Sequence, residues 1–158
     1  MTMTAFFRNK VIPFLWEWEG IKYEDDPRDP GNNPPPTANQ SYRGTKFGID
    51  ARSHPNVDIK NLTSEQASEI YWNDWIRMGC DHLPQSMGWA FFDTAQNLGV
   101  GRANEFLKQS NGNINKFIDL REEKYRTIGK IYPNMAYAVN GWINRAEALK
   151  KQVATYEN

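Results

Sequence analysis

The sequence predicts a mainly α-helical protein with a single domain. Apolar residues recur at spacings of three and four over most of the 158 residues, and strand patterns are confined to one short segment. The length corresponds to one domain, with a core large enough to fold without disulfide or metal crosslinks. Hydrophobic residues make up 39% of the chain and charged residues 24%, which is ordinary for a globular protein.

The first apolar pattern predicts a helix that ends near Gly20. Pro13 lies inside it, and because proline removes a backbone hydrogen bond, we expect a kink or a restart there. Residues 25–44 are rich in Pro, Gly, Asn and Asp and predict a long loop, of a length that is usually functional or disordered. Residues 42–49 predict one arm of a short hairpin. The apolar residues of the first helix are Phe7, Val11, Phe14, Leu15 and Trp18.

Four further helices and one shorter helix are expected in the rest of the chain. Thr63 and Gln66 form a capping-box pattern that opens the second helix. The clearest apolar stripe begins near Pro84 and ends at Gly99. The remaining patterns predict a short helix over 102–109, a helix over 115–131 and a last helix over 135–153.

Composition excludes several classes of protein. The formal net charge is 0 and the sequence pI is about 6.7, so neither nucleic acid nor an anionic membrane is an expected partner. One cysteine, Cys80, cannot form an internal disulfide, and with two histidines it makes a poor zinc site. We expect no metal, no organic cofactor and no membrane insertion. The N-terminus lacks a signal-peptide pattern, which predicts a cytoplasmic protein at synthesis. The aromatic content of 13% fits either a packed core or a cleft with stacking surfaces.

Acidic residues are the candidates for chemistry. Glu19 falls at the C-terminal end of the first helix, where the helix dipole disfavours a carboxylate, and the neighbouring Leu15 and Trp16 would desolvate it. Both effects raise the pKa of a carboxyl group, as a general acid requires. Glycoside hydrolysis uses two carboxyl groups with unequal pKa values. The alternative is a solvated helix end followed by turn-forming aspartates. The acids of the next loop are Glu24, Asp25, Asp26 and Asp29.

Five motifs occur in order over most of the chain, from about Phe14 to Leu149. They resemble glycoside hydrolase family 108, a family of phage and prophage N-acetylmuramidases that includes secretion activators. The resemblance implies a lysozyme-like, two-lobed helical fold with at most a small β-hairpin. Residues 1–158 would form one domain, with a catalytic lobe over about 1–80 and a helical lobe over about 84–158 that resembles a peptidoglycan-binding region. The motifs are FLWEWEGIKYEDDPRDPG, GTKFGID, LTSEQASEIYWNDWIRMGCDHLP, FFDTAQNLGVGRA and NGWINRAEAL.

The resemblance also assigns residues. The glutamate of the family's E-G-G-Y box falls on Glu19 and the tyrosine on Tyr23, although the box is one residue longer here and Ile21 replaces the second glycine. The D-P-x-D-P-G loop matches residues 26–31 in full and places the second acid at Asp29, with Asp25 and Asp26 as alternatives. Residues 32–43 are inserted before the T-x-x-G-I motif, and we expect them to project and to shape the substrate groove.

Three further residues are expected to bind substrate together with Tyr23. Thr45, from the T-x-x-G-I motif, would position a water or a sugar hydroxyl; alternatively it only begins a strand. Asp93 and Asn97, from an F-D-x-x-x-N-x-G motif, lie four residues apart on one helix. They would hold the cleft, or they form an ordinary surface pair.

The function implied is hydrolysis of the β-1,4 bond between N-acetylmuramic acid and N-acetylglucosamine in peptidoglycan. Glu19 would be the general acid, and Asp29 would stabilise the transition state or activate water. The expected setting is a monomeric phage endolysin that reaches the wall through a holin; a virion-borne lysozyme stays open. The alternative is a non-catalytic peptidoglycan-binding or secretion-assisting protein with the same fold.

Overall fold

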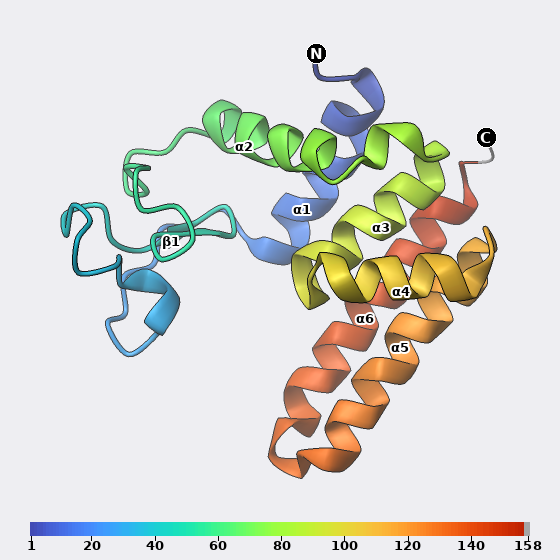
Figure 1. The fold of residues 1–158 in the computed structure, drawn as a ribbon. Coiled ribbons are helices and arrows are strands. Elements are labelled where there is room, and N and C mark those ends of the chain that lie inside the picture. Colours follow the sequence, from blue (N-terminus) through green and yellow to red (C-terminus); the bar gives the residue numbers. More distant parts are fainter. Residues whose placement is uncertain (157–158) are drawn as a thin grey trace. The chain divides into compact units, whose positions relative to one another are not determined.

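Six α-helices and one two-stranded sheet make up the computed structural model, which describes residues 1–156 (Figure 1). About 64% of the chain is helical, which confirms the mainly helical, lysozyme-like fold class. The helices are α1 (Ile12–Glu19), α2 (Ser64–Arg77), α3 (Gln85–Leu98), α4 (Val100–Ser110), α5 (Ile114–Ile131) and α6 (Ala136–Ala154). Short 3-10 turns cover Pro30–Asn32, Cys80–His82 and Pro133–Met135.

The N-terminal helix is interrupted as predicted. A π-helical turn over Phe7–Val11 precedes α1, and Pro13 lies in the first turn of α1. The backbone stays helical through Val11 and Ile12, so the missing N–H of Pro13 coincides with a change from π-helical to α-helical hydrogen bonding. Gly20, with φ of +81°, ends the helix. Glu19 is therefore the last helical residue, at a fixed point of the chain.

Local signals also placed the start of α2 correctly. Gln66 N donates to Thr63 Oγ1 at 3.1 Å, while Thr63 N donates to Gln66 Oε1 at 2.9 Å. This is the reciprocal pair of a capping box. The predicted short helix over 102–109 is longer than expected, because α4 begins directly after Gly99.

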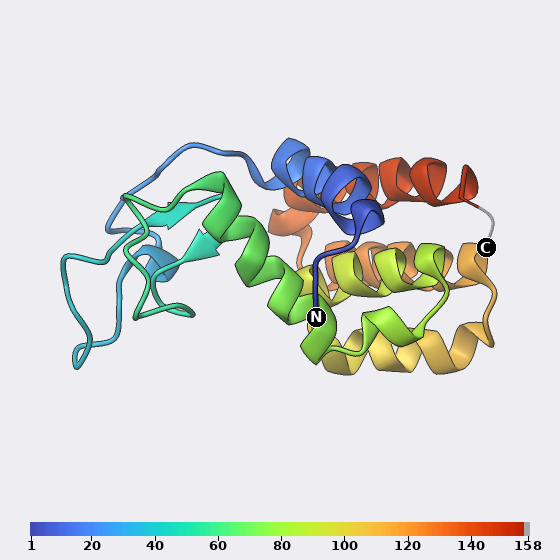
Figure 2. The same cartoon turned by 90° about the horizontal axis from the view of Figure 1, so that it is seen from above.

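The hairpin is more compact than the sequence indicated. Residues 42–49 were expected to form one arm, but both arms lie within 45–50: β1 (Thr45–Lys46) pairs antiparallel with β2 (Ile49–Asp50) (Figure 2). The two connecting residues, Phe47 and Gly48, have φ values of +56° and +76°. Two consecutive positive φ angles define the tight turn that matches the twist of the flanking strands. The pattern was missed because phenylalanine is uncommon at such a position.

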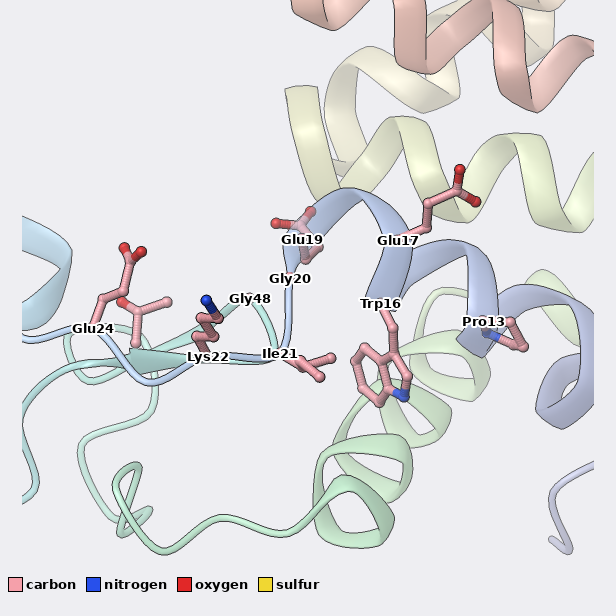
Figure 3. A pocket seen from close by; sticks show the side chains of 10 residues that line it. Pro13, Trp16, Glu17, Glu19, Gly20, Ile21, Lys22, Glu24 and Gly48 are labelled. Carbon is pink, nitrogen blue, oxygen red and sulfur yellow. The ribbon is translucent and has the colours of Figure 1, made fainter.

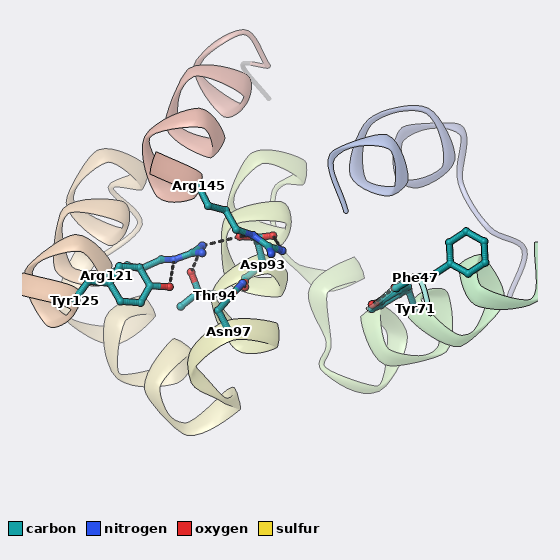
Figure 4. Close-up of polar contacts among 8 residues, drawn as sticks. All are labelled: Phe47, Tyr71, Asp93, Thr94, Asn97, Arg121, Tyr125 and Arg145. Atoms are coloured by element: carbon teal, nitrogen blue, oxygen red, sulfur yellow. Dashed lines mark hydrogen bonds and ion pairs between the residues drawn. The ribbon is translucent and has the colours of Figure 1, made fainter. Parts of the chain in front are cut away.

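The chain divides into two compact units, Met1–Asp74 and Trp75–Asn158. In the second unit, α3 packs against α4, α5 and α6, and its residues 86–95 are all buried. Inside this helical core, Asp93 binds two arginines (Figure 4). Arg121 Nη1 donates to Asp93 Oδ2 at 2.8 Å, and Arg145 Nη2 donates to Asp93 Oδ1 at 2.7 Å. This network joins α3, α5 and α6.

Glu122, on α5 of the same unit, makes stability depend on pH. Its side chain is buried, and burial together with the adjacent carboxyl group of Glu147 raises its pKa to about 7, against the opposing charge of Arg126. A raised folded-state pKa stabilises the fold below the pKa of the unfolded chain, and this stability is lost as pH rises towards 7. We expect Glu122→Gln to be more stable than wild type at pH 8, by on the order of 2 kcal/mol. Urea unfolding at pH 4.5 and pH 8 measures the effect.

The matched control is Glu123→Gln, because Glu123 is the exposed neighbour on the same helix. This variant is expected to follow the wild-type pH dependence. Equal stability of Glu122→Gln and wild type at both pH values would contradict the assignment.

Candidate active site

A cavity of about 700 Å³ opens where α1 ends (Figure 3). It is formed by the end of α1, by the extended segment that follows it and by the hairpin. Its walls combine apolar and charged side chains. Its lining residues are Pro13, Trp16, Glu17, Glu19, Gly20, Ile21, Lys22, Glu24, Thr45 and Gly48.

Glu19 reaches this cavity from the end of α1, and the hairpin turn packs against its side chain. A Cβ built on Gly48 would lie 2.9 Å from Glu19 Cγ and 2.6 Å from Tyr71 Oη. Only a residue without a side chain fits at this contact. The structure contradicts one expectation: Glu19 is exposed, so Leu15 and Trp16 do not bury it. The periodicity placed these residues on one helix face, but Leu15 turns into the core.

Aromatic packing holds the hairpin turn in place. Tyr71 Oη donates to the Phe47 carbonyl at 2.8 Å. The Trp16 ring lies 4.9 Å from the Phe47 ring and 5.8 Å from the Tyr71 ring, between centroids. Residues of α1, the turn and α2 thus meet in one cluster. It fixes Gly48 against Glu19, and it gives the positive φ of Phe47 a structural reason.

This contact leads to a prediction for Gly48→Ala. The new methyl group would collide with Tyr71 Oη and Glu19 Cγ, while the positive φ adds backbone strain. Gly79 is a matched control, since its φ is also +76° and its Cβ would meet nothing within 4 Å. We expect Gly79→Ala to cost about 1 kcal/mol of unfolding free energy, and Gly48→Ala about 1–3 kcal/mol more. Equal losses in urea unfolding would show that the close contact is not important.

The Tyr23 side chain contacts the backbone of the protein rather than lining the cavity. Its hydroxyl donates to the Arg43 carbonyl at 2.9 Å, and a Cβ on Gly44 would lie 2.7 Å from its Oη. Burial, and then the charge of Asp25, raise the Tyr23 pKa. Tyr23 is absent from the described residues that line the cavity. The ring therefore packs on the backbone that leads into β1, and a direct contact with substrate stays a prediction.

The four acids of the following loop differ in their surroundings. Asp25 pairs with Arg43 Nε, and Asp26 pairs with Arg28 at 2.7 Å. Asp29 accepts from Gly31 N at 2.9 Å and thereby caps the turn Pro30–Asn32. Within residues 1–156, Glu24 is the acid of this loop that lines the cavity with Glu19. In Figure 3 the Glu19 and Glu24 carboxyl groups point in the same direction, and Lys22 lies between the two residues.

Thr45 lines the same cavity and is held on two sides. Its backbone pairs with that of Glu24: Glu24 N donates to Thr45 O at 2.9 Å and Thr45 N donates to Glu24 O at 2.8 Å. Its hydroxyl donates to Asn32 Oδ1 at 2.5 Å. Asn32, only 2% exposed, also donates to the Asp26 carbonyl at 3.0 Å. The Thr45 side chain is thus fixed at the cavity wall.

Asn32 also changes the interpretation of the inserted segment 32–43. We expected the whole segment to project, but Asn32 and Pro34 are buried at its base. The base packs because Asn32 supplies hydrogen bonds to backbone and side chains on both sides of the loop. Residues 39–41 are exposed, so projection is confined to the outer part.

Asp93 and Asn97 belong to the second unit. The surface-pair alternative is wrong, since Asp93 is 1% exposed and bound by two arginines. Its carboxylate therefore forms ion pairs inside the core. The sequence pattern misled because charged side chains are seldom buried unless they are paired, and no partner of Asp93 is close to it in the sequence. Asn97 is exposed and donates to the Asp93 carbonyl at 2.7 Å. Whether Asn97 contacts substrate stays a prediction.

Sequence reasoning did not assign Ile21 or Lys22 to the site, and it named Glu24 only as one of several acids of the loop. Ile21 and Lys22 lie in the stretched E-G-x-x-Y box, and their departure from the family pattern was the available signal. Over the described residues, no group of three or more His, Cys, Asp or Glu is arranged to hold a metal ion.

The carboxyl groups of Glu19 and Glu24 line one cavity, and a pair of carboxyl groups is what glycoside hydrolysis requires. The comparison with protein families supports this class of reaction. The family described as Glycosyl hydrolase 108 matches residues 12–99, and the chain belongs to this family. The membership makes the protein a lysozyme-like peptidoglycan hydrolase. No curated protein and no solved structure gives a significant match.

Proposed function

We propose that this protein is an N-acetylmuramidase that cleaves the β-1,4 bond from N-acetylmuramic acid to N-acetylglucosamine, with Glu19 as the general acid. The observation that carries the proposal is the position of Glu19. It ends a helix, lines the cavity and is held by the close approach of Gly48. A proton donor must lie at a fixed point relative to the bond that breaks, and this contact supplies such a point.

The reaction requires two events at the anomeric carbon. Glu19 donates its proton to the glycosidic oxygen as the carbon–oxygen bond breaks, and a water molecule adds to the anomeric carbon. Because positive charge develops on the sugar ring, a nearby carboxylate stabilises the transition state. The loop after α1 supplies acids for this role.

The walls of the cavity fit a saccharide. Trp16 and Ile21, which is 56% exposed, provide apolar surface on one side of Glu19. The CH-rich face of a sugar ring packs well on such a surface. On the other side, Lys22 and Thr45 offer hydrogen-bond partners for hydroxyl and acetamido groups. A cavity of about 700 Å³ has room for sugar units of a long strand.

The biological setting that we propose is host lysis by a phage endolysin that acts as a monomer. In residues 1–156, no helix combines the length and the apolar character needed to cross a bilayer. An endolysin made in the cytoplasm would need a holin to reach the wall. Lysis of cells by added protein, with and without permeabilisation of the inner membrane, would test this route.

Product analysis tests the bond specificity. Purified sacculi are digested with the protein, the new reducing ends are reduced with borohydride, and the sugar alcohols are identified by mass spectrometry. A muramidase leaves N-acetylmuramitol. Glucosaminitol ends would contradict the bond assignment, and binding to sacculi without new reducing ends would favour the non-catalytic alternative.

A further inference from the structure

We propose that Glu24, rather than Asp29, is the second catalytic carboxylate, and that it accepts a proton from the attacking water. The inference rests on the proposed function, because it takes Glu19 as the acid. It starts from the cavity: Glu19 and Glu24 both line it, and Asp29 is not among its lining residues.

The other acids of the loop have structural partners. Asp25 pairs with Arg43, and Asp26 forms bonds to Arg28 through both oxygens and through the Arg28 backbone N–H. Asp29 accepts the Gly31 N–H as the cap of a turn. Each of these carboxylates therefore stabilises the loop. Within residues 1–156, the Glu24 side chain forms no such hydrogen bond or ion pair, and it lines the open cavity.

Backbone hydrogen bonds fix the position of Glu24. Glu24 and Thr45 form an antiparallel bridge with two hydrogen bonds, of 2.9 and 2.8 Å. Residues paired across antiparallel strands project from the same face, with Cβ atoms about 5 Å apart. The Glu24 carboxylate and the Thr45 hydroxyl thus share one face at the cavity. A flexible loop would not hold a base so well.

This arrangement suits a water molecule. The Thr45 hydroxyl donates its proton to Asn32 Oδ1, so its oxygen accepts a hydrogen bond from the water. The water's other proton points to Glu24. In the reaction the water oxygen bonds to the anomeric carbon, Glu24 takes a water proton, Glu19 gives its proton to the leaving oxygen, and the glycosidic bond breaks. One water is consumed, and solvent returns the proton from Glu24 to Glu19.

Alanine variants with azide rescue test the assignment. Azide is a nucleophile that needs no base, so it replaces the water when the base is missing. We expect Glu24→Ala to lower kcat on soluble glycan chains by at least about 10²-fold with little change in KM. Sodium azide should restore part of the rate and yield a glycosyl azide, which mass spectrometry detects. A residue that only supports the fold would not show this rescue.

Two variants serve as comparisons. Asp26→Ala is expected to retain most of the wild-type rate, without azide dependence. Asp29→Ala tests the other candidate. A large loss of kcat with azide rescue in Asp29→Ala, and no azide rescue in Glu24→Ala, would overturn the inference and identify Asp29 as the base. A Glu24→Ala protein that is folded by circular dichroism and hydrolyses normally, or that shows only a raised KM, would overturn it as well. The proposed function fails separately, if folded Glu19→Gln stays active or the wild type forms no new reducing ends.

Discussion

Glu19→Gln is expected to lower the rate of wall hydrolysis by at least about 10²-fold, because glutamine has the shape of glutamate but cannot protonate the leaving oxygen. The melting temperature should change little, since Glu19 is exposed. The measurement is the fall in turbidity of a suspension of purified walls, together with thermal unfolding of each variant.

Glu17→Gln is the matched control. Glu17 belongs to the same helix and lines the same cavity, but two residues along a helix place its side chain about 200° from that of Glu19. We expect a far smaller loss of lysis for this variant. Substantial lysis by folded Glu19→Gln, or equal losses in the two variants, would rule out Glu19 as the acid.

The second large effect concerns stability. Burial alone would raise the pKa of Asp93, but the charges of Arg121 and Arg145 and their hydrogen bonds lower it below its usual range. Asp93→Asn removes the one negative charge that the two buried guanidinium groups share. Breaking a buried ion pair in this way costs about 3–5 kcal/mol. Urea unfolding at pH 7 should show a loss of that size.

Asp119→Asn provides the comparison, since Asp119 joins Lys150 across α5 and α6 at 2.8 Å but lies largely in solvent. Its loss should be below about 1 kcal/mol. In the wild type, ionised Asp93 contributes to the free energy of unfolding at neutral pH, and this contribution is lost as acid protonates the folded carboxylate. The difference in unfolding free energy between wild type and Asp93→Asn should therefore shrink at low pH. A difference that is constant with pH would contradict the ionic explanation.

Local features of this chain could be predicted from its sequence, and long-range ones could not. The capping box at Thr63 and Gln66 depends on neighbours within one turn, so the pattern was sufficient. The contact between Glu19 and Gly48 joins distant residues and requires a tight turn with Phe47 at an unfavourable φ. Only the packing of Trp16 and Tyr71 makes that turn stable, and periodicity carries no information about it.

The same difference between local and long-range signals explains which candidate residues the sequence could identify. Glu19 followed from its place at a helix end and from the family motif. For Asp93 the sequence left two alternatives, a role at the cleft or a surface pair. Its ion pairs in the core could not be predicted, because Arg121 and Arg145 come from two later helices and cannot be paired with it from spacing. Glu24 was named only as one of several acids, since its pairing with Thr45 arises from strand register rather than from sequence distance.

The base of the inserted segment has a practical consequence. Gly44 N donates to the Asn32 carbonyl at 2.8 Å, and the Thr45 hydroxyl bonds to the Asn32 side chain, so the two ends of residues 33–43 are joined. Lengthening a loop whose ends already meet costs little free energy. The outer part of this loop is therefore a grafting site: a peptide that recognises the surface polymer of a chosen bacterium could be inserted beside the cavity without moving Thr45.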